Sequence, residues 1–157
     1  MIKKSFWSFF VIISIFTIDR LSKIAIIKSS EIYGETNIFV SSFLSLNLIW
    51  NDGIAFGLFS FDKNIYYDFL TAIIILITTV VLWMIFKTKK LEKFAFTMIF
   101  GGSLGNIFDR LYYSSVPDFI DLHVNNFHWF IFNVADIFIS LGVILLIYLE
   151  IFLKKKV

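Results

Sequence analysis

The chain contains no cysteine and a single proline among its 157 residues, and only 17% of the residues are charged. Without cysteine there can be no disulfide, thiol nucleophile or Cys-ligated metal centre. The scarcity of charge excludes intrinsic disorder, which requires a polar, charge-rich composition. A net charge of +2 is too small to indicate a nucleic-acid partner, and no glycine-rich phosphate-binding loop is present in the sequence.

Apolar residues are in excess instead. They make up 59% of the chain, with 21 Phe among them, and the mean hydropathy is +0.85. Soluble domains average about 45–50% apolar and about 25% charged residues, so this chain carries more apolar surface than a small soluble domain can bury. No internal repeat or Pro/Ser linker divides the sequence. The composition therefore predicts an integral membrane protein of one domain.

Four stretches of the sequence have the length of a membrane-spanning helix. Residues 69–86 are uncharged, whereas the other three stretches contain a few charged residues. At about 1.5 Å per residue, about 17 to 25 residues cross the roughly 30 Å of hydrocarbon. The first stretch has the length of a signal-peptide core, but Asp19 and Arg20 follow where small cleavage-site residues are expected, which favours a retained span. We predict an all-α integral membrane protein with four transmembrane helices, at about residues 5–27, 66–86, 94–110 and 129–153.

Basic residues are distributed unevenly between the predicted loops. Nine of the 14 Lys and Arg residues lie in the two tails and in the loop after the second span, and only Lys28 and Lys63 lie in the loops on the other side. The positive-inside rule then places both termini in the cytoplasm. The extracytoplasmic side holds a long segment, residues 28–65, and a shorter loop, residues 111–128. Alternation of apolar and polar residues around positions 39–50 predicts a small β-rich region between the first two helices.

Polar side chains from three of the predicted helices fall at one depth, in the outer half of the membrane. They are Asp19 and Lys23 in the first helix, Asn106, Asp109 and Arg110 in the third, and Asn133 and Asp136 in the fourth, joined by Asn51 and Asp118 from the outer segments. Ionisable groups are costly in lipid and usually mark function. The structural alternative, in which the pairs Asp19–Lys23 and Asp109–Arg110 only stabilise the bundle, is about equally favoured for those pairs.

Two of the carboxylates, Asp118 and Asp136, have no basic residue close to them in the sequence. Unpaired carboxylates at one membrane interface suit a dyad that shares a proton, because their mutual repulsion raises one pKa. The deprotonated member would activate water while the protonated member donates to a carbonyl oxygen, as peptide hydrolysis requires. From the residues alone this stays a hypothesis beside purely structural roles. A small proton-coupled exporter that uses one membrane carboxylate is the alternative function class.

Two other patterns are weaker. The segment Gly101-Gly-Ser-Leu-Gly105 formally matches the G-x-S-x-G motif of serine hydrolases, but that motif needs a strand-to-helix turn, and helix packing is the favoured interpretation here. His123 and His128 lie in a predicted loop without the spacing of a known zinc motif. We therefore predict neither a metal site nor a cofactor.

The polar residues described above are concentrated in five segments spread over almost the whole chain. They are Asp19-Arg-Leu-Ser-Lys23, Asn51-Asp-Gly-Ile-Ala-Phe-Gly57, Gly101-Gly-Ser-Leu-Gly-Asn-Ile-Phe-Asp-Arg110, Val116-Pro-Asp-Phe-Ile-Asp121 and Phe132-Asn-Val-Ala-Asp136. In this order the segments resemble the conserved blocks of the bacterial lipoprotein signal peptidases, the signal peptidase II family. Each segment alone is a weak signal, but all five on a chain of four predicted spans are specific.

The resemblance implies an aspartic endopeptidase of the bacterial cytoplasmic (inner) membrane, with its site near the extracytoplasmic face, that cleaves the signal peptide from diacylglyceryl-modified prolipoproteins. Its partners are then these substrates and the phospholipid bilayer, and we expect a monomer. By matching positions, the catalytic residues are Asp118 and Asp136, and the substrate-binding residues are Asp19, Lys23, Asn51, Gly53, Asn106, Arg110 and Asn133. Ser22, Ile54 and Pro117 replace the family's usual Thr, Ala and Val, which bears on substrate range more than on activity.

Overall fold

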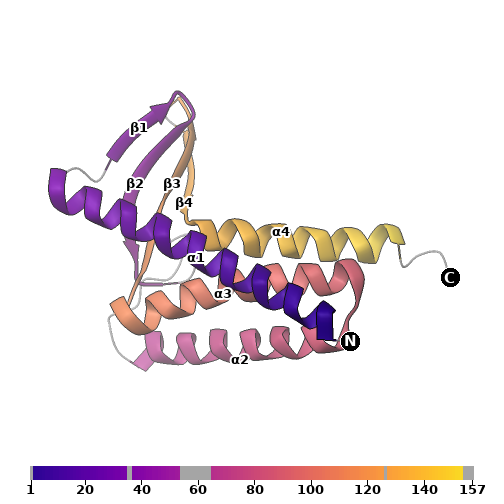
Figure 1. Ribbon diagram of the computed structural model, residues 1–157. Coiled ribbons are helices and arrows are strands. Elements are labelled where there is room, and N and C mark those ends of the chain that lie inside the picture. Colours follow the sequence, from indigo (N-terminus) through magenta and orange to yellow (C-terminus); the bar gives the residue numbers. More distant parts are fainter. Residues whose placement is uncertain (1, 35–36, 54–64, 126, 154–157) are drawn as a thin grey trace.

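The computed structural model describes residues 2–34, 37–53, 65–125 and 127–153. In chain order the elements are α1 (Ile2–Tyr33), β1 (Asn37–Ser41), β2 (Leu44–Asn51), α2 (Ile65–Lys87), α3 (Lys90–Tyr113), β3 (Val116–Val124), β4 (Phe127–Phe132), α4 (Val134–Tyr148) and a π-helical turn, η2 (Leu149–Leu153). Figure 1 shows the helices as a bundle, with the strands at one end and both the start of α1 and the end of α4 at the other.

The helices expose apolar side chains and bury charged ones, which is the reverse of a soluble protein. Phe6 and Leu76 are 68% and 65% exposed, whereas Asp19, Lys23 and Asp109 are fully buried. Monomeric soluble proteins rarely expose apolar patches larger than a few hundred Å². The outer surface of the bundle therefore suits a lipid environment, and the buried charges must satisfy one another.

Two helical stretches in the described part of the chain, Tyr67–Lys87 and Val134–Leu153, are long and apolar enough to cross a membrane. The remaining long helices, α1 and α3, contain charged residues that lower their mean hydropathy. Composition thus supports a span in α2 and in α4, and the four-span arrangement stays a prediction.

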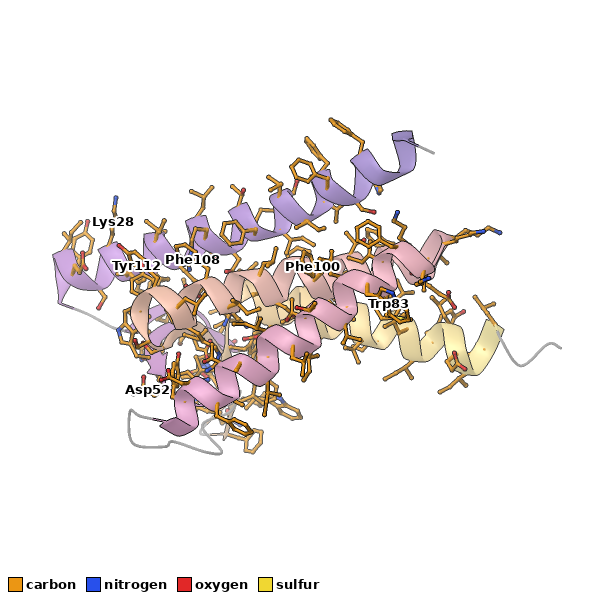
Figure 2. All side chains as sticks on the ribbon, turned by 90° about the horizontal axis from the view of Figure 1, so that it is seen from below. Lys28, Asp52, Trp83, Phe100, Phe108 and Tyr112 are labelled. Carbon is orange, nitrogen blue, oxygen red and sulfur yellow. The ribbon has the colours of Figure 1, made fainter. Side chains whose placement is uncertain are left out.

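The central helix is α3, which packs against α1, α2 and α4. Glycines make this close packing possible. A Cβ atom at Gly102 would lie 2.5 Å from the carbonyl oxygen of Ala135 in α4, and one at Gly105 would lie 2.5 Å from Oδ2 of Asp19 in α1. The Gly101–Gly105 segment lies within this helix, so it packs helices together and forms no strand-to-helix turn. Figure 2 shows Phe108 and Tyr112 on the same helix, where it faces α1.

The strands form one antiparallel sheet in the order β1-β2-β3-β4. Because β2 follows α1 and β3 follows α3, the sheet joins two segments that lie far apart in the sequence. The prediction of strands only between the first two helices was therefore incomplete. Residues 129–132, which we assigned to the fourth span, lie in β4, and α4 begins only at Val134. Aromatic and β-branched residues suit a strand as well as a membrane helix, so composition alone could not separate the two.

Candidate active site

The two predicted catalytic carboxylates meet at Asn133, at the junction between the sheet and α4. Asp118 lies on β3 and Asp136 lies in the first turn of α4. Nδ2 of Asn133 donates a hydrogen bond of 2.6 Å to Oδ1 of Asp118. The backbone N–H of Asn133 donates to Oδ2 of Asp136 at 3.1 Å, and Oδ1 of Asn133 accepts from the Asp136 N–H at 3.1 Å. One residue thus binds both carboxylates.

This geometry follows from the local sequence Asn133-Val-Ala-Asp136. Asn133 has an extended backbone and caps α4, and Asp136 is the third residue of the helix, so the two side chains form a reciprocal capping box. Such a box satisfies N–H groups that the first turn of a helix leaves without partners. The same local preference that starts the helix therefore fixes the position of the Asp136 carboxylate.

Asp118 is held from its other side by β2. Nδ2 of Asn51 donates to Oδ2 of Asp118 at 2.9 Å, and Oδ1 of Asn51 accepts from the N–H of Gly53 at 3.0 Å. Asp118 is only 5% exposed. Burial, together with the negative charge of Asp136, raises the pKa of Asp118 to about 6, although the amide donors of Asn51 and Asn133 lower it. A carboxyl group with this pKa can bind and release a proton near neutral pH.

Asp136 is oriented by a chain of hydrogen bonds that starts at Lys23 in α1. Nδ2 of Asn106 donates to Oδ1 of Asp136 at 2.8 Å, and Oδ1 of Asn106 accepts from Nζ of Lys23 at 2.9 Å. An ammonium group can only donate, so Lys23 dictates which end of the Asn106 amide faces Asp136. The amide is thereby turned to donate to the carboxylate.

Lys23 also binds two buried carboxylates behind the dyad. Its Nζ lies 2.9 Å from Oδ2 of Asp19 and 2.6 Å from Oδ2 of Asp109. Oδ1 of Asp19 in turn accepts from the N–H of Ala135 at 2.9 Å, which ties α1 to the first turn of α4. Asp19 and Lys23, predicted to bind substrate, are fully buried, so in this structure they support the dyad from behind.

Asp109 and Arg110 do not form the local ion pair that was one interpretation of the sequence. Asp109 pairs with Lys23 and with Arg20. Arg110 instead donates from Nη2 to the carbonyl oxygen of Gly53, and its guanidinium lies 5.3 Å from the ring centre of Tyr67. Adjacent residues on a helix point about 100° apart, which explains why the two side chains separate.

Sequence reasoning missed Arg20 as a member of this network. Its guanidinium pairs with Asp109 and lies 4.9 Å from the ring centre of Phe108. The available signal was its position next to Asp19, inside a stretch long enough to span the membrane. Ile54, the substitution expected to bear on substrate range, lies outside the described residues.

An apolar groove of about 670 Å³ opens beside the dyad. Asp118 and Asp136 form part of its wall, and the rest comes mainly from β4 and α4, with Phe43, Trp129, Phe130, Phe132, Ile137 and Leu141 among the lining residues. Sequence reasoning also missed the β4 residues in this lining, because it placed them in a transmembrane helix. Two carboxylates at the wall of an apolar groove can perform acid–base chemistry on a substrate with an extended apolar portion.

Comparison with known proteins agrees with the five sequence segments. Residues 11–152 match the family model described as signal peptidase (SPase) II. The chain is 44% identical over 155 residues to the lipoprotein signal peptidase of Pelagibacter ubique strain HTCC1062, covering 99% of this chain and 93% of that protein. It is 42% identical over 121 residues to the lipoprotein signal peptidase of Francisella tularensis subsp. novicida strain U112, covering 74% of this chain and 75% of that protein.

Two solved structures that resemble this chain are also described as membrane enzymes. One, described as a bacterial membrane enzyme at 2.3 Å resolution, superposes with a TM-score of 0.79 and 28% identity, over 91% of this chain and 86% of that chain. A second, described as a bacterial membrane enzyme at 1.9 Å resolution, gives a TM-score of 0.77 and 28% identity over 92% of both chains.

Proposed function

The chain belongs to the signal peptidase II family of lipoprotein signal peptidases, which are bacterial membrane proteases, and on that premise we propose that it is an aspartic endopeptidase with Asp118 and Asp136 as its catalytic pair. We further propose that its substrates are diacylglyceryl-modified prolipoproteins and that it cleaves their signal peptides. Membership of a protease family removes the reason to prefer a proton-coupled exporter.

The observation that carries the proposal is that Asn133 hydrogen-bonds both carboxylates in the wall of the apolar groove. Repulsion between the two carboxylates favours a pair that holds one proton. The deprotonated carboxylate takes a proton from water, and the resulting hydroxide attacks the carbonyl carbon of the scissile peptide bond. The protonated carboxyl donates to the carbonyl oxygen, and a proton then passes to the leaving nitrogen as the C–N bond breaks.

The remaining site residues are proposed to act in two groups. Asn51, Asn106 and Asn133 orient the carboxylates through the hydrogen bonds described above. Gly53 and Arg110 lie beside Asn51, and the Nη1 group of Arg110, which has no hydrogen-bond partner within the described residues, is proposed to bind a substrate carbonyl or ester oxygen. Asp19 and Lys23 hold the start of α4 and the Asn106 amide in place from inside the bundle. The apolar groove binds the hydrophobic part of the substrate.

We also propose that all four long helices span the membrane with both termini in the cytoplasm. Four lysines lie at the connection between α2 and α3, at the end of the bundle opposite the sheet (Figure 1): Lys87, Lys89, Lys90 and Lys93. By the positive-inside rule that end faces the cytoplasm. The sheet and the dyad then lie at the extracytoplasmic face of the bacterial cytoplasmic membrane, and the chain acts there as a monomer.

The test is cleavage of a diacylglyceryl-modified prolipoprotein by the purified protein in detergent. Asp118→Asn and Asp136→Asn are each expected to lower kcat by about 10³-fold or more, and the double variant is expected to be no worse, because residues that act as a unit are non-additive. Membrane insertion is expected to be unchanged in all three.

Two control variants make the result specific. Asp68→Asn removes an exposed carboxylate from the first turn of α2, and Ser103→Ala removes the hydroxyl of the formal G-x-S-x-G match. Both are expected to cleave at near the wild-type rate. Wild-type activity in either dyad variant would contradict the aspartic mechanism, and loss of turnover in Ser103→Ala with the fold preserved would favour serine chemistry instead.

A further inference from the structure

The hairpin of β3 and β4 carries a cluster of potential metal ligands that the proposed reaction does not use. The cluster consists of Asp121, His123 and His128, and one ligand atom from each residue lies within 4.8 Å of the other two. The antiparallel register places His123 directly opposite His128. These are the chain's two histidines, so the fold brings both to one place.

The groups of this cluster are arranged for binding a cation. Asp121 is 2% exposed, and its two carboxylate oxygens lie 3.0 and 2.9 Å from Nδ1 of His128. The two imidazole rings are stacked, with centroids 5.1 Å apart and planes inclined by 28°. The side chain of His128 is 57% exposed, which leaves the cluster open to solvent on one side.

A second observation points to a ligand at the same place. Nδ1 of His123 is buried and has no hydrogen-bond partner within the described residues. A buried polar atom without a partner is energetically unfavourable. Coordination of a metal ion would use the lone pair of this nitrogen.

We propose that Asp121, His123 and His128 form a binding site for a divalent transition-metal ion of the Zn²⁺ class. Two imidazole nitrogens and one carboxylate oxygen are ligands that Zn²⁺ favours, with a fourth position left for water. Hard cations such as Mg²⁺ and Ca²⁺ prefer sites made of oxygen ligands. The sequence predicted no metal site because the residues follow no linear motif, and their proximity arises from strand pairing.

The proposed ion would join the two strands of the hairpin. Asp121 and His123 belong to β3, and His128 belongs to β4. Asp118 lies on β3 three residues before Asp121, and His123 contributes to the wall of the apolar groove. Metal binding would therefore stiffen the strand that carries one proposed catalytic residue. The proposed metal site depends only on the fold, so its test is independent of the proposed peptidase reaction.

The test measures Zn²⁺ binding to the protein, purified in detergent without a histidine tag, by isothermal titration calorimetry. Wild-type protein is expected to bind one Zn²⁺, and Co²⁺ at the same site is expected to give visible absorption bands of a tetrahedral complex. His128→Ala and His123→Ala are each expected to weaken binding by at least about tenfold, and the double variant to abolish it. Since the side chain of His128 is largely exposed, its replacement is expected to preserve the fold, which the unfolding transition of the variant without metal checks.

The matched control is Asp68→Asn, which removes an exposed carboxylate from α2 and is expected to leave Zn²⁺ binding unchanged. As a second readout, Zn²⁺ is expected to raise the Tm of the wild type and of Asp68→Asn, because a ligand that binds only the folded state stabilises it. It should leave the Tm of the double histidine variant unchanged. Equal Zn²⁺ affinity in the wild type and the double variant, or no binding by the wild type, would overturn the proposal.

Discussion

At the scale of single residues, Asn133 shows how one side chain can serve both fold and site. Its carbonyl oxygen accepts from the first turn of α4, and its amide nitrogen donates to Asp118. Serine has too short a side chain to bridge these groups, and aspartate would place a third negative charge against two carboxylates. An amide is therefore the side chain that can cap the helix and bind the dyad together.

The first residue-scale prediction concerns the pH dependence of stability. Because the pKa of Asp118 is raised from 3.8 to about 6, the folded protein binds a proton there more tightly than the unfolded chain does. The stabilisation is complete below pH 3.8 and is lost as the pH rises through about 6. At about 1.4 kcal/mol per pKa unit, this amounts to roughly 3 kcal/mol.

The measurement compares Tm against pH for the wild type and Asp118→Asn in the same detergent. Between pH 4 and pH 7.5 the Tm of the wild type is expected to fall relative to that of Asp118→Asn, which lacks this titrating group. Carboxylates remote from the site affect both proteins equally, so the difference reports the titration of Asp118 together with that of Asp136, to which it is coupled. Parallel curves would show that the pKa of Asp118 is not raised.

A second residue-scale prediction concerns Arg110. Its guanidinium donates to the carbonyl of Gly53 and stacks near Tyr67, and it does not pair with Asp109. Arg110→Lys keeps the charge but loses the planar fork, so kcat/KM is expected to fall at least about tenfold while Tm stays close to wild type. Kinetics and thermal unfolding are measured on the same purified variant. A lower Tm with normal kinetics would assign Arg110 a structural role.

At the scale of elements, the site depends on how closely α3 approaches its neighbours. Three separate contacts fix the start of α4. Asn133 caps the helix, the Asp19 carboxylate accepts from the N–H of Ala135, and Gly102 packs closely against the carbonyl group of Ala135. Each contact comes from a different element. The position of Asp136 is therefore set by the packing of α1, α3 and α4 together.

This arrangement predicts different outcomes for two glycines one turn apart. A Cβ at Gly105 would lie 2.5 Å from Oδ2 of Asp19, whose carboxylate is already held by Lys23 and the Ala135 N–H. Gly105→Ala is expected to lower the free energy of unfolding by about 1–3 kcal/mol and to reduce kcat, since Asp19 must move.

Gly101→Ala serves as the comparison, because its Cβ would meet the apolar side chain of Ile15 at 3.1 Å and not a charged residue of the Lys23 network. Gly101→Ala is expected to keep more of the wild-type activity than Gly105→Ala. Thermal unfolding and turnover of both variants check this order. An equal or larger loss of turnover in Gly101→Ala would contradict the role assigned to Asp19.

At the scale of the whole molecule, the two ends of the helix bundle differ. Figure 2 shows Lys28 projecting from α1 away from the bundle and Asp52 beside the start of α2. Both lie at the end with the sheet, whereas the Lys-rich connection between α2 and α3 lies at the other. This difference between the two ends is the basis of the proposed orientation in the membrane.

The orientation can be tested by cysteine labelling, because the natural chain has no cysteine. In intact spheroplasts a membrane-impermeant maleimide is expected to label Lys28→Cys and to leave Lys89→Cys unlabelled until the membrane is permeabilised. Ile77→Cys, exposed in the middle of α2, is the control that should react poorly in both cases because the proposed orientation places it in the lipid. An epitope tag at the N-terminus is expected to be accessible only after permeabilisation. Labelling of Lys89→Cys in intact spheroplasts would invert the proposed topology.

What the sequence determined by itself was the membrane environment, the family and the identity of the polar residues. Excess apolar composition and the absence of cysteine are properties of the chain and need no coordinates. The five segments are likewise linear patterns, and the family match over residues 11–152 confirms what they indicated. The capping box at Asn133 and Asp136 is also local, so the spacing of these residues sufficed to place them together.

Only the tertiary structure decided the partners of each charge and the extent of the sheet. Asp109 pairs across helices with Lys23 and Arg20, and Arg110 reaches a loop carbonyl, although the two are neighbours in sequence. The pairing of β2 with β3 and the His123–His128 contact join residues whose proximity no periodicity encodes. The physical reason is that an ionisable group buried in a bundle selects whichever counter-charge or donor lies nearest in space, and packing sets that distance.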